Sequence, residues 1–401
     1  MRLHFHALLS IAQGFNDEYC GRSELPKYIP PDQGRSVEKV HVFFRHGMRT
    51  DIQRHSCFPN NEQPAYTCSL NTEVGVRSSS KGPENARILV KKYSSGCEVG
   101  QLLDYAETQM ARIADFLRSN YGSRKMILRS TDKTRTLGSI DLLVTHLGDA
   151  APATVHTQEY EEDPLSLNDN SCAMKAYLDS TFRSSTAFKR VTVDSEYFSN
   201  CASRWVEEIG TPFDLVQVGD CLVAPQCAEV PLPGGSHASP DLYACVENVF
   251  NSVRQLQYNA NSTGSWTEGK DYCKLATRSL WGEVLKVSAA QDYSMSLWAT
   301  HDDVIACLLS SLSLWNGKWP RYASLLVIEE LSDGRIRILH EGIPIFETST
   351  WTTLLPEFVF DDNMYRHACE IETEISQSTF ADLLLRGVGV SALLNAIVPL
   401  R

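Results

Sequence analysis

The chain of 401 residues has no basic surplus: 37 lysine and arginine residues stand against 49 aspartate and glutamate residues, for a net charge of −12. Nucleic acid is therefore not expected as the main partner, because there is no excess of cations to neutralise its phosphates. No run of about 20 apolar residues occurs, so no transmembrane helix is expected. Internal repeats and low-complexity tracts are also absent, and 43% hydrophobic with 21% charged residues is ordinary globular usage. An acidic chain like this one can bind an anion only by gathering arginines in one place.

The sequence also lacks any Cys-x-x-Cys pair, which leaves zinc-ribbon and thioredoxin-like sites without support. Its 12 cysteines are scattered instead, a pattern typical of disulfides in an oxidising compartment. The sequon Asn261-Ser262-Thr263 predicts glycosylation at Asn261 and also favours secretion. The alternative is a cytosolic protein with several buried thiols. Cys307 lies in an apolar helical pattern and is the first candidate for a free core thiol.

The two termini carry different signals. Residues 1–14 resemble a short signal sequence, with Met1-Arg2 followed by apolar residues that His4 and His6 interrupt. We therefore expect a secreted or lumenal protein of the secretory pathway or the lysosome. The apolar tail is broken by Arg386, Asn395 and Pro399, so residues 346–401 are expected to pack on the core rather than to serve as a lipid-anchor signal.

Hydrophobic periodicity alternates between strand and helix in the first part of the chain. Apolar strands are predicted at residues 40–44 and 126–128, and amphipathic helices at 101–121 and 134–147. Alternation of this kind is the pattern of a parallel sheet covered by helices. It resumes near the end with a strand at 294–300, a helix at 303–314 and two strands at 324–328 and 335–339 joined by a turn at Ser332-Asp333-Gly334.

The stretch between these two parts breaks the rhythm, because it is polar, mostly helical in pattern and rich in cysteine. The sequence therefore predicts an α/β fold, a mostly parallel sheet flanked by helices, with a mainly helical domain inserted into it. The α/β domain is discontinuous and covers residues 36–150 and 286–345. The inserted domain covers residues 151–285.

The strongest chemical signal is Arg45-His46-Gly47-Met48-Arg49, directly after the first apolar strand. In open α/β sheets, ligands bind beyond the carboxyl ends of the strands. Arg45 and Arg49 offer planar donor groups suited to phosphate oxygens, and their charges favour a neutral, nucleophilic imidazole at His46. Gly47 allows the backbone to turn closely around a bound group. The alternative is a solvated basic turn containing one satisfied histidine.

This segment resembles the Arg-His-Gly-x-Arg signature of the histidine acid phosphatases, within the histidine phosphatase superfamily. Two further segments resemble the same family in the same order: Leu128-Arg129-Ser130-Thr131-Asp132 with Arg135-Thr136-Leu137, and Ser296 to Asp302, which ends in a His-Asp pair. Similarity also runs through residues 320–324. The resemblance covers roughly residues 38–145 and 290–345. Faint similarity at residues 100–102 and 336–339 points to the acid phosphatase and phosphoxylose phosphatase branch.

The resemblance implies a phosphomonoesterase that works through a covalent phosphohistidine on His46. Arg45, Arg49, Arg129 and His301 would hold the phosphate oxygens and stabilise the transition state. Asp302 would protonate the leaving group in an acidic pH range and then activate water, although as a favoured N-cap residue it also suits a purely structural role. Asp132 and Arg135 are expected only to support Arg129.

No metal or organic cofactor is expected, since the mechanism needs none and His55 and Cys57 lack partners at metal-ligand spacing. The expected partner is a small-molecule, sugar or lipid phosphomonoester, and the sequence leaves a homodimer open. Disulfide connectivity is not determined by spacing.

The first motif departs from the family in two places. Met48 stands where the family usually has a small or acidic residue. Thr50-Asp51 follows Arg49 where the family usually has one residue and then a proline. Asp303 also follows the His-Asp pair where a hydroxyl or small apolar residue is commoner. The alternative is therefore a catalytically weak relative that binds an anionic ligand or a protein partner. A third hypothesis, a phosphotransferase like phosphoglycerate mutase, is disfavoured by the His-Asp pair, the cysteines and the sequon.

Overall fold

The computed structural model describes residues 18–32, 34–52, 57–62, 64–70, 77–79, 82–84, 97, 99–148, 154–158, 163–167, 175, 178, 182–213, 218–235, 237–258, 269–351 and 354. The signal sequence expected at residues 1–14, the sequon at Asn261 and nearly all of the tail expected at 346–401 lie outside this part of the chain.

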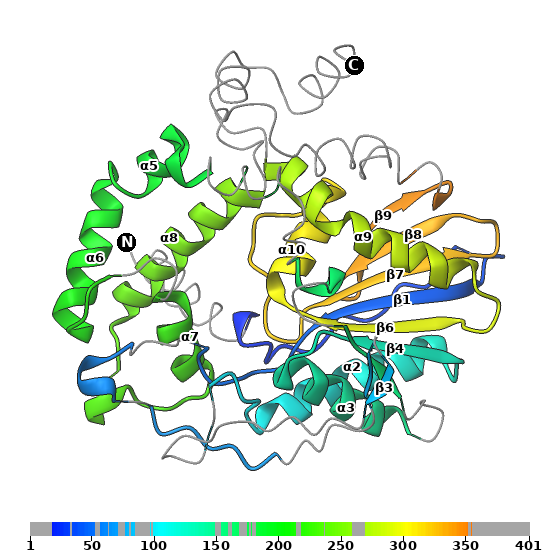
Figure 1. Ribbon diagram of the computed structural model, residues 1–401, viewed down its shortest axis with the longest axis horizontal. Helices are drawn as coiled ribbons and strands as arrows, with labels where there is room; N and C mark the ends of the chain where they lie inside the picture. Colours follow the sequence, from blue (N-terminus) through cyan, green and yellow to red (C-terminus); the bar gives the residue numbers. More distant parts are fainter. Residues whose placement is uncertain are drawn as a thin grey trace, which may run out of the picture.

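Within the described residues, one sheet of nine strands has the order β3-β2-β5-β4-β6-β1-β7-β8-β9 (Figure 1). Its middle is parallel, with β1 (Val37–Arg45) beside β6 (Met295–Thr300), β6 beside β4 (Met126–Ser130), and then β5 (Val155–His156) and β2 (Arg77–Ser79). Arg45 is opposite Thr300, and Ser130 is opposite Ala299. The residues that follow β1, β4 and β6 therefore meet at one edge of the sheet.

Antiparallel strands extend the sheet at both sides. β3 (Gly82–Glu84) pairs with β2, and β7 (Leu325–Leu331), β8 (Ile336–His340) and β9 (Ile343–Thr348) form a meander that starts against β1. The turn predicted at residues 332–334 joins β7 to β8. β9 is an addition that the sequence did not indicate, since its side chains alternate between exposed and half-buried.

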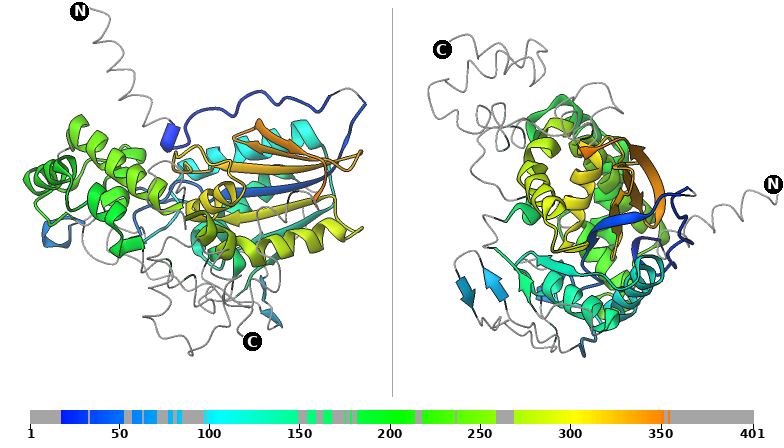
Figure 2. Two further views of the ribbon diagram at one scale, coloured as in Figure 1. Left: turned by 90° about the horizontal axis from the view of Figure 1, so that it is seen from above. Right: turned by 90° about the vertical axis from the view of Figure 1, so that its right-hand side faces the viewer.

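Helices cover both faces of the sheet, as Figures 1 and 2 show. On one face, α2 (Tyr105–Tyr121) and α3 (Thr134–Leu147) pack on Val42 and Phe44 of β1 and on their neighbours. On the other face, α9 (Gly269–Ala289) and α10 (Asp302–Ser311) pack on Phe43 and on the residues around it. Successive residues of a strand point to opposite faces, so β1 contributes to both cores and reads as a continuous apolar run.

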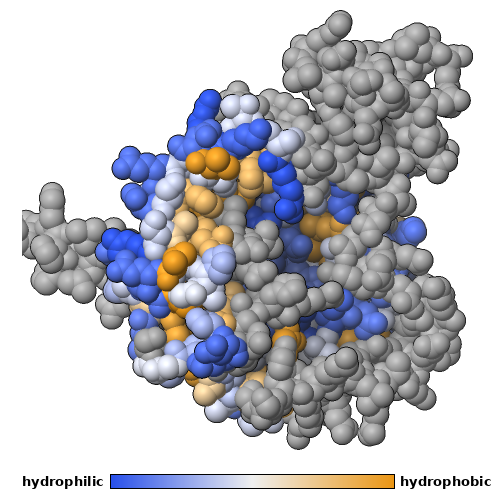
Figure 3. All heavy atoms as spheres, turned by 60° about the vertical axis from the view of Figure 1, so that its left-hand side comes forward, coloured by the Kyte–Doolittle hydropathy of each residue, from blue (hydrophilic) through white to orange (hydrophobic). Residues whose placement is uncertain are grey.

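A second group of helices lies beside the carboxyl-terminal edge of the sheet, at the left of Figure 1, and we call it the helical lobe. It consists of α5 (Thr186–Val191), α6 (Glu196–Ile209), α7 (Val218–Cys227) and α8 (Pro240–Tyr258). Side chains cap two of these helices, since Ser185 and Ser195 accept hydrogen bonds from the first turns of α5 and α6. The view of Figure 3 shows hydrophobic residues standing among hydrophilic ones on this side of the molecule.

Short 3₁₀ helices complete the described elements: η1 (Pro59–Asn61), η2 (Pro164–Ser166) and η3 (Pro233–Gly235). No helix among the described residues is both long and apolar enough to cross a membrane.

Five disulfides link distant segments of the described chain: Cys20–Cys227, Cys57–Cys221, Cys68–Cys97, Cys201–Cys245 and Cys273–Cys307. The prediction that Cys307 is a free core thiol is therefore wrong. Helices α9 and α10 pack side by side, and this packing brings Cys273 against Cys307 in a way that spacing along the chain did not reveal.

The α/β fold class is confirmed, and the predicted strands and helices of the first and last parts are present. One difference has a clear cause. Helix α2 begins at Tyr105 rather than at residue 101, because Gln101 and Leu103 form backbone hydrogen bonds of 2.9 Å with Thr50 and Met48. The expected boundary at residue 285 falls inside α9, and β5 adds residues 155–156 to the sheet.

Candidate active site

His46 follows β1 directly and is 1% exposed. Its Nδ1 lies 2.9 Å from the Gly47 carbonyl oxygen, which can only accept a hydrogen bond, so Nδ1 carries the proton and Nε2 keeps its lone pair. Burial, followed by the charges of Arg135 and Arg45, holds the pKa of His46 well below its ordinary value. The imidazole is therefore neutral and presents a nucleophilic nitrogen.

Gly47 is required for packing as much as for ligand approach. A Cβ at this position would lie 2.6 Å from the Ala106 Cβ on α2, too close for any real contact. The backbone N–H of Gly47 donates to Ser139 Oγ at 2.9 Å, and that of Met48 donates to Gln109 Oε1 at 2.7 Å. The loop is thus held against α2 and α3, a packing role for Gly47 that the sequence did not indicate.

Arg45 and Arg49 are both buried beside His46. Arg45 Nη1 donates to the Pro320 carbonyl at 2.9 Å, and its guanidinium carbon lies 4.2 Å from the Tyr322 ring centroid. The Nε–H groups of both arginines are buried and donate no hydrogen bond within the described part of the chain. Unsatisfied buried donors on two cations are what an anion-binding site requires.

His301 follows β6 and faces His46, with ring centroids 5.7 Å apart. Its Nε2 lies 3.0 Å from Thr131 Oγ1, and its Nδ1 lies 3.4 Å from Nη2 of Arg135. An arginine can only donate, so Nδ1 is an acceptor and Nε2 carries the proton. Burial and then the charge of Arg135 hold the pKa of His301 well below its ordinary value, which makes it a second neutral imidazole.

Asp302 forms an ion pair with Arg45, at 2.6 Å between Oδ2 and Nη2. Burial opposes ionisation of Asp302, but the guanidinium groups of Arg45 and Arg49 outweigh it and hold the pKa of this carboxyl well below its ordinary value. Without a bound anion, Asp302 is therefore ionised. Any role as a proton donor depends on what occupies the arginines.

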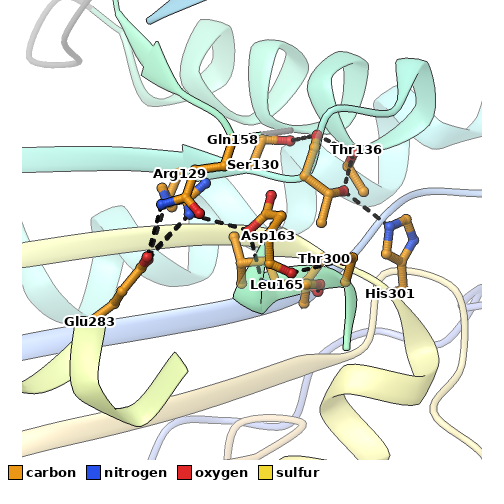
Figure 4. A network of polar contacts seen from close by, with 11 residues as sticks. Arg129, Ser130, Thr136, Gln158, Asp163, Leu165, Glu283, Thr300 and His301 are labelled. Carbon is orange, nitrogen blue, oxygen red and sulfur yellow. Dashed lines mark hydrogen bonds and ion pairs between the residues drawn. The ribbon is translucent and has the colours of Figure 1, made fainter. Parts of the chain in front are cut away.

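The structure does not bring Arg129 to this site, contrary to the sequence prediction. Its guanidinium forms ion pairs with Asp163 and Glu283, both at 3.2 Å, and Figure 4 shows it directed toward these carboxylates and away from His301. The cause is strand geometry. Arg129 is opposite Trp298 on β6, so it points to the face covered by α9 rather than beyond the strand end.

Arg135, which sequence analysis assigned to support Arg129, occupies the expected place instead. Among the neighbouring charges, that of Arg135 lowers the pKa of both His46 and His301 the most. The available signal was its position, since Arg135 is the second residue of α3 and therefore lies at a helix N-terminus beside the strand ends.

Two of the departures from the family pattern contact these groups, since the Thr50 carbonyl accepts a hydrogen bond from Arg49 Nη1 at 2.9 Å and Asp303 lines the cavity described below. Met48 is 1% exposed and packs with Cys20, Tyr66 and Leu103, so it does not reach the cavity described below. Thr50 and Asp51 are also buried, and Asp51 Oδ2 accepts a hydrogen bond from Tyr66 at 3.5 Å.

A cavity of about 220 Å³ opens in front of Arg45, Arg49 and Asp302. The helical lobe lines its other side, through Asp220 and Val223 of α7 and a group of α8 residues, Val246, Glu247, Phe250, Asn251 and Arg254. Burial and the neighbouring Asp302 raise the pKa of Asp303 to about 6, and burial raises the pKa of Glu247 to about 7. Within the described residues, no three His, Cys, Asp or Glu side chains are grouped as a metal site would require.

No protein-family model matches the chain. Two curated relatives do: "Putative acid phosphatase 5" of Caenorhabditis elegans, 22% identical over 317 residues, and the lysosomal acid phosphatase of Rattus norvegicus, 22% identical over 318 residues. The matches cover 73% and 75% of this chain, and 66% and 69% of those proteins. The chain therefore spans about two thirds of the length of these relatives.

Solved structures give the same fold. The phytase of Klebsiella sp. ASR1 matches with a TM-score of 0.52 at 13% identity, over 76% of this chain and 83% of that one. The phytase of Citrobacter braakii matches with a TM-score of 0.50 at 12% identity, over 77% and 85%. Together with the ordered motifs, these similarities support the resemblance to the histidine acid phosphatases.

Proposed function

We propose that this chain hydrolyses phosphomonoesters through a covalent phosphohistidine on His46. One observation carries the proposal: a buried, neutral imidazole has its Nδ1–H bound to the Gly47 carbonyl, and its Nε2 is left among the charges of Arg45, Arg49 and Arg135. A nucleophile surrounded by cations suits attack on an anionic phosphoryl group, because the cations attract the anion and stabilise the charge of the transition state.

The phosphoryl oxygens would be held by Arg45, Arg49, Arg135 and His301. The first two contribute the unsatisfied Nε–H groups, and His301 contributes a neutral donor once it turns from Thr131. Arg135 takes the role that the sequence assigned to Arg129. Charge spread over the three equatorial oxygens in the transition state is stabilised by donors that are already in place.

In the first step, Nε2 of His46 forms a bond to phosphorus while the bond from phosphorus to the ester oxygen breaks. The leaving alkoxide takes a proton from the carboxyl of Asp302. In the second step, the Asp302 carboxylate takes a proton from water, whose oxygen attacks phosphorus, and the bond to Nε2 breaks with its electron pair returning to His46. Phosphate and alcohol are the products, and the enzyme is restored.

The proton on Asp302 needs a source, because this carboxyl is ionised when it is paired with Arg45. A phosphomonoester loses its second proton near pH 6, so below this pH it arrives as a monoanion that carries a proton. Binding places that proton beside Asp302, while the phosphoryl group competes for Arg45 and raises the pKa of the carboxyl. Activity is therefore expected in the acidic range.

The relatives support the general activity, since both are named as acid phosphatases. The five disulfides fit a secreted or lumenal location, and one of the relatives is named as lysosomal. We propose a small-molecule, sugar or lipid phosphomonoester as substrate. We also retain the proposal of an inserted domain within residues 151–285, of which β5 and α9 pack with the sheet.

The test is hydrolysis of 4-nitrophenyl phosphate between pH 4 and pH 8 by the full chain and by His46→Ala. Loss of the nucleophile is expected to lower kcat by at least about 10⁴-fold. Rapid acid-free quenching with labelled substrate should trap a phosphoenzyme that is stable in alkali and labile in acid, as a phosphohistidine is, and that is absent from the variant.

His41→Asn is the matched control, because His41 is a second buried histidine on β1, bound to Ser296 and Glu330 in the middle of the strand. It should retain kcat. A folded, oxidised wild type with no turnover on any monoester, or an active His46→Ala, would reject the proposal and leave the anion-binding relative as the remaining hypothesis.

A further inference from the structure

The helical lobe supplies a carboxylate to the phosphate-binding arginines. Asp220 of α7 forms an ion pair with Arg49, at 2.9 Å between Oδ1 and Nη1, and Oδ2 lies 3.1 Å from the same nitrogen. Asp220 Oδ2 also accepts the backbone N–H of Ile52 at 2.5 Å. One side chain from a helix 171 residues away in sequence thus holds both the guanidinium and the loop behind it.

Helix α7 is itself fastened to the active-site region by two disulfides. Cys221, the residue after Asp220, is bonded to Cys57, in the segment that follows Arg49. Cys227, the last residue of α7, is bonded to Cys20. Cys20 adjoins Tyr19, whose ring lies 5.5 Å from the guanidinium carbon of Arg45. Both ends of this short helix are therefore anchored beside one of the two arginines of the motif.

The geometry of Arg49 shows why such an anchor matters. Its Nη1 is occupied by Asp220 and by the Thr50 carbonyl at 2.9 Å, which sets the plane of the guanidinium. Its buried Nε–H remains available for an anion. A guanidinium recognises phosphate through the direction of its donors, so fixing one nitrogen determines where the others point.

We propose that Asp220 is a positioning residue that orients Arg49 for phosphate, and that the Cys57–Cys221 disulfide keeps it in place. The phosphate site is then assembled from both parts of the molecule, with the arginine supplied by the sheet edge and its orientation supplied by the helical lobe. The catalytic consequence rests on the proposed function, whereas the effect on phosphate binding does not.

A competing interpretation makes the opposite prediction. If the Asp220 carboxylate acted only through its charge, it would repel a phosphate dianion, and its removal would tighten binding. If it positions Arg49, its removal loosens the guanidinium and weakens binding. The sign of the change therefore separates the two interpretations.

The experiment measures the dissociation constant of inorganic phosphate by calorimetry at pH 5, together with kcat and KM for 4-nitrophenyl phosphate, on the full oxidised chain. Asp220→Ala is expected to raise both the phosphate dissociation constant and KM by about tenfold, the loss of a charge-assisted hydrogen bond, with a smaller change in kcat. Asp220→Asn keeps an acceptor for the Ile52 N–H and should lie between wild type and Asp220→Ala.

Asp241→Ala is the matched control, because Asp241 is an exposed lobe carboxylate paired with Arg204 at 3.4 Å. Its phosphate affinity should equal that of wild type. Unchanged or tighter phosphate binding by Asp220→Ala would overturn the proposal, and if that variant does not fold, tighter or equal binding by Asp220→Asn decides in the same way.

The disulfide is tested with the pair Cys57→Ser and Cys221→Ser, expected to weaken phosphate binding about threefold, against the pair Cys201→Ser and Cys245→Ser between α6 and α8. Equal effects of the two pairs would reject the anchoring role. A wild type that binds no phosphate would reject the inference itself, whereas one that binds phosphate but hydrolyses no ester would reject only the proposed function.

Discussion

Two buried groups of arginine and carboxylate side chains lie close to each other at the carboxyl-terminal ends of the parallel strands. In the first, Arg45, Arg49 and Arg135 surround His46, and the carboxylates Asp302 and Asp220 each hold one arginine. In the second, Arg129 is the cation and Asp163 and Glu283 are both bound to it. The first group has more cations than carboxylates, whereas the second has two carboxylates for one cation (Figure 4). Nη1 of Arg129 is also buried without a hydrogen-bond partner among the described residues, so the balance of charge is what separates the two groups.

The two groups also differ in the state of their carboxyls. Arg45 and Arg49 overcome burial at Asp302 and hold its pKa well below the ordinary value. At Asp163, burial dominates over Arg129 and raises the pKa to about 6. An arginine near a strand end is therefore not sufficient evidence of an anion site. The ratio of cations to carboxylates around it decides whether positive charge remains for an anion.

The largest expected effect contrasts the two arginines directly. Arg135→Ala should lower kcat/KM for 4-nitrophenyl phosphate by about 10²–10³-fold, because a donor to the developing charge is lost. Arg129→Ala, measured per folded enzyme, should change it by less than about tenfold. Arg135→Lys should recover part of the loss, since the charge returns without the planar donors. A greater loss of kcat/KM in Arg129→Ala than in Arg135→Ala would show that Arg129 binds phosphate after all.

A smaller effect on stability is expected from Arg129→Met. Removing the cation leaves Asp163 and Glu283 without their partner, which should lower the free energy of unfolding by about 2–3 kcal/mol at pH 7.5. The loss should be smaller at pH 5, where Asp163 is protonated and needs no cation. Denaturant unfolding at both pH values is the measurement, and Arg118→Met, at an exposed pair with Asp115, is the control. An equal loss at both pH values would contradict this account of the network.

The smallest effect concerns Asp163 itself. Its pKa in the folded protein is raised to about 6 from an ordinary value of 3.8, so its stabilising contribution is complete below pH 3.8 and is lost as the pH rises through 6. Asp163→Asn stays neutral at every pH. It should therefore reduce the drop in unfolding free energy between pH 5 and pH 7.5 by about 1–2 kcal/mol. Asp241→Asn should leave that drop unchanged, and the same drop in Asp163→Asn as in wild type would refute the assigned titration.

Much of the α/β part could be predicted from the sequence, because its elements follow local periodicity. The helix Thr134–Leu147 has the predicted bounds, and β1, β4 and β6 lie where apolar strands were expected. β9 and β5 were missed for a physical reason. The first has half-exposed alternating side chains and the second is two residues long, so neither produces a continuous apolar run.

The site was predicted in part for a related reason. Arg45 is the last residue of β1, and His46, Arg49, His301 and Asp302 follow strand ends closely. Parallel strands bring such residues together. Arg129 was misplaced because it lies one residue before the end of β4, where the alternation of the strand turns it toward α9. Arg129 and Trp298 point to the same face of the sheet because of the register between β4 and β6, and only the tertiary structure reveals this register.

The sequence by itself determined the fold class, the three motifs, the expected nucleophile at His46 and the abundance of cysteine, because each depends on residues that are neighbours along the chain. Only the tertiary structure decided that Arg135 rather than Arg129 stands by His46, that Cys307 is bonded to Cys273, and that Asp220 holds Arg49. The physical reason is that a local pattern specifies which face of an element is buried, whereas the partner of a buried charge or thiol is specified by how distant elements pack.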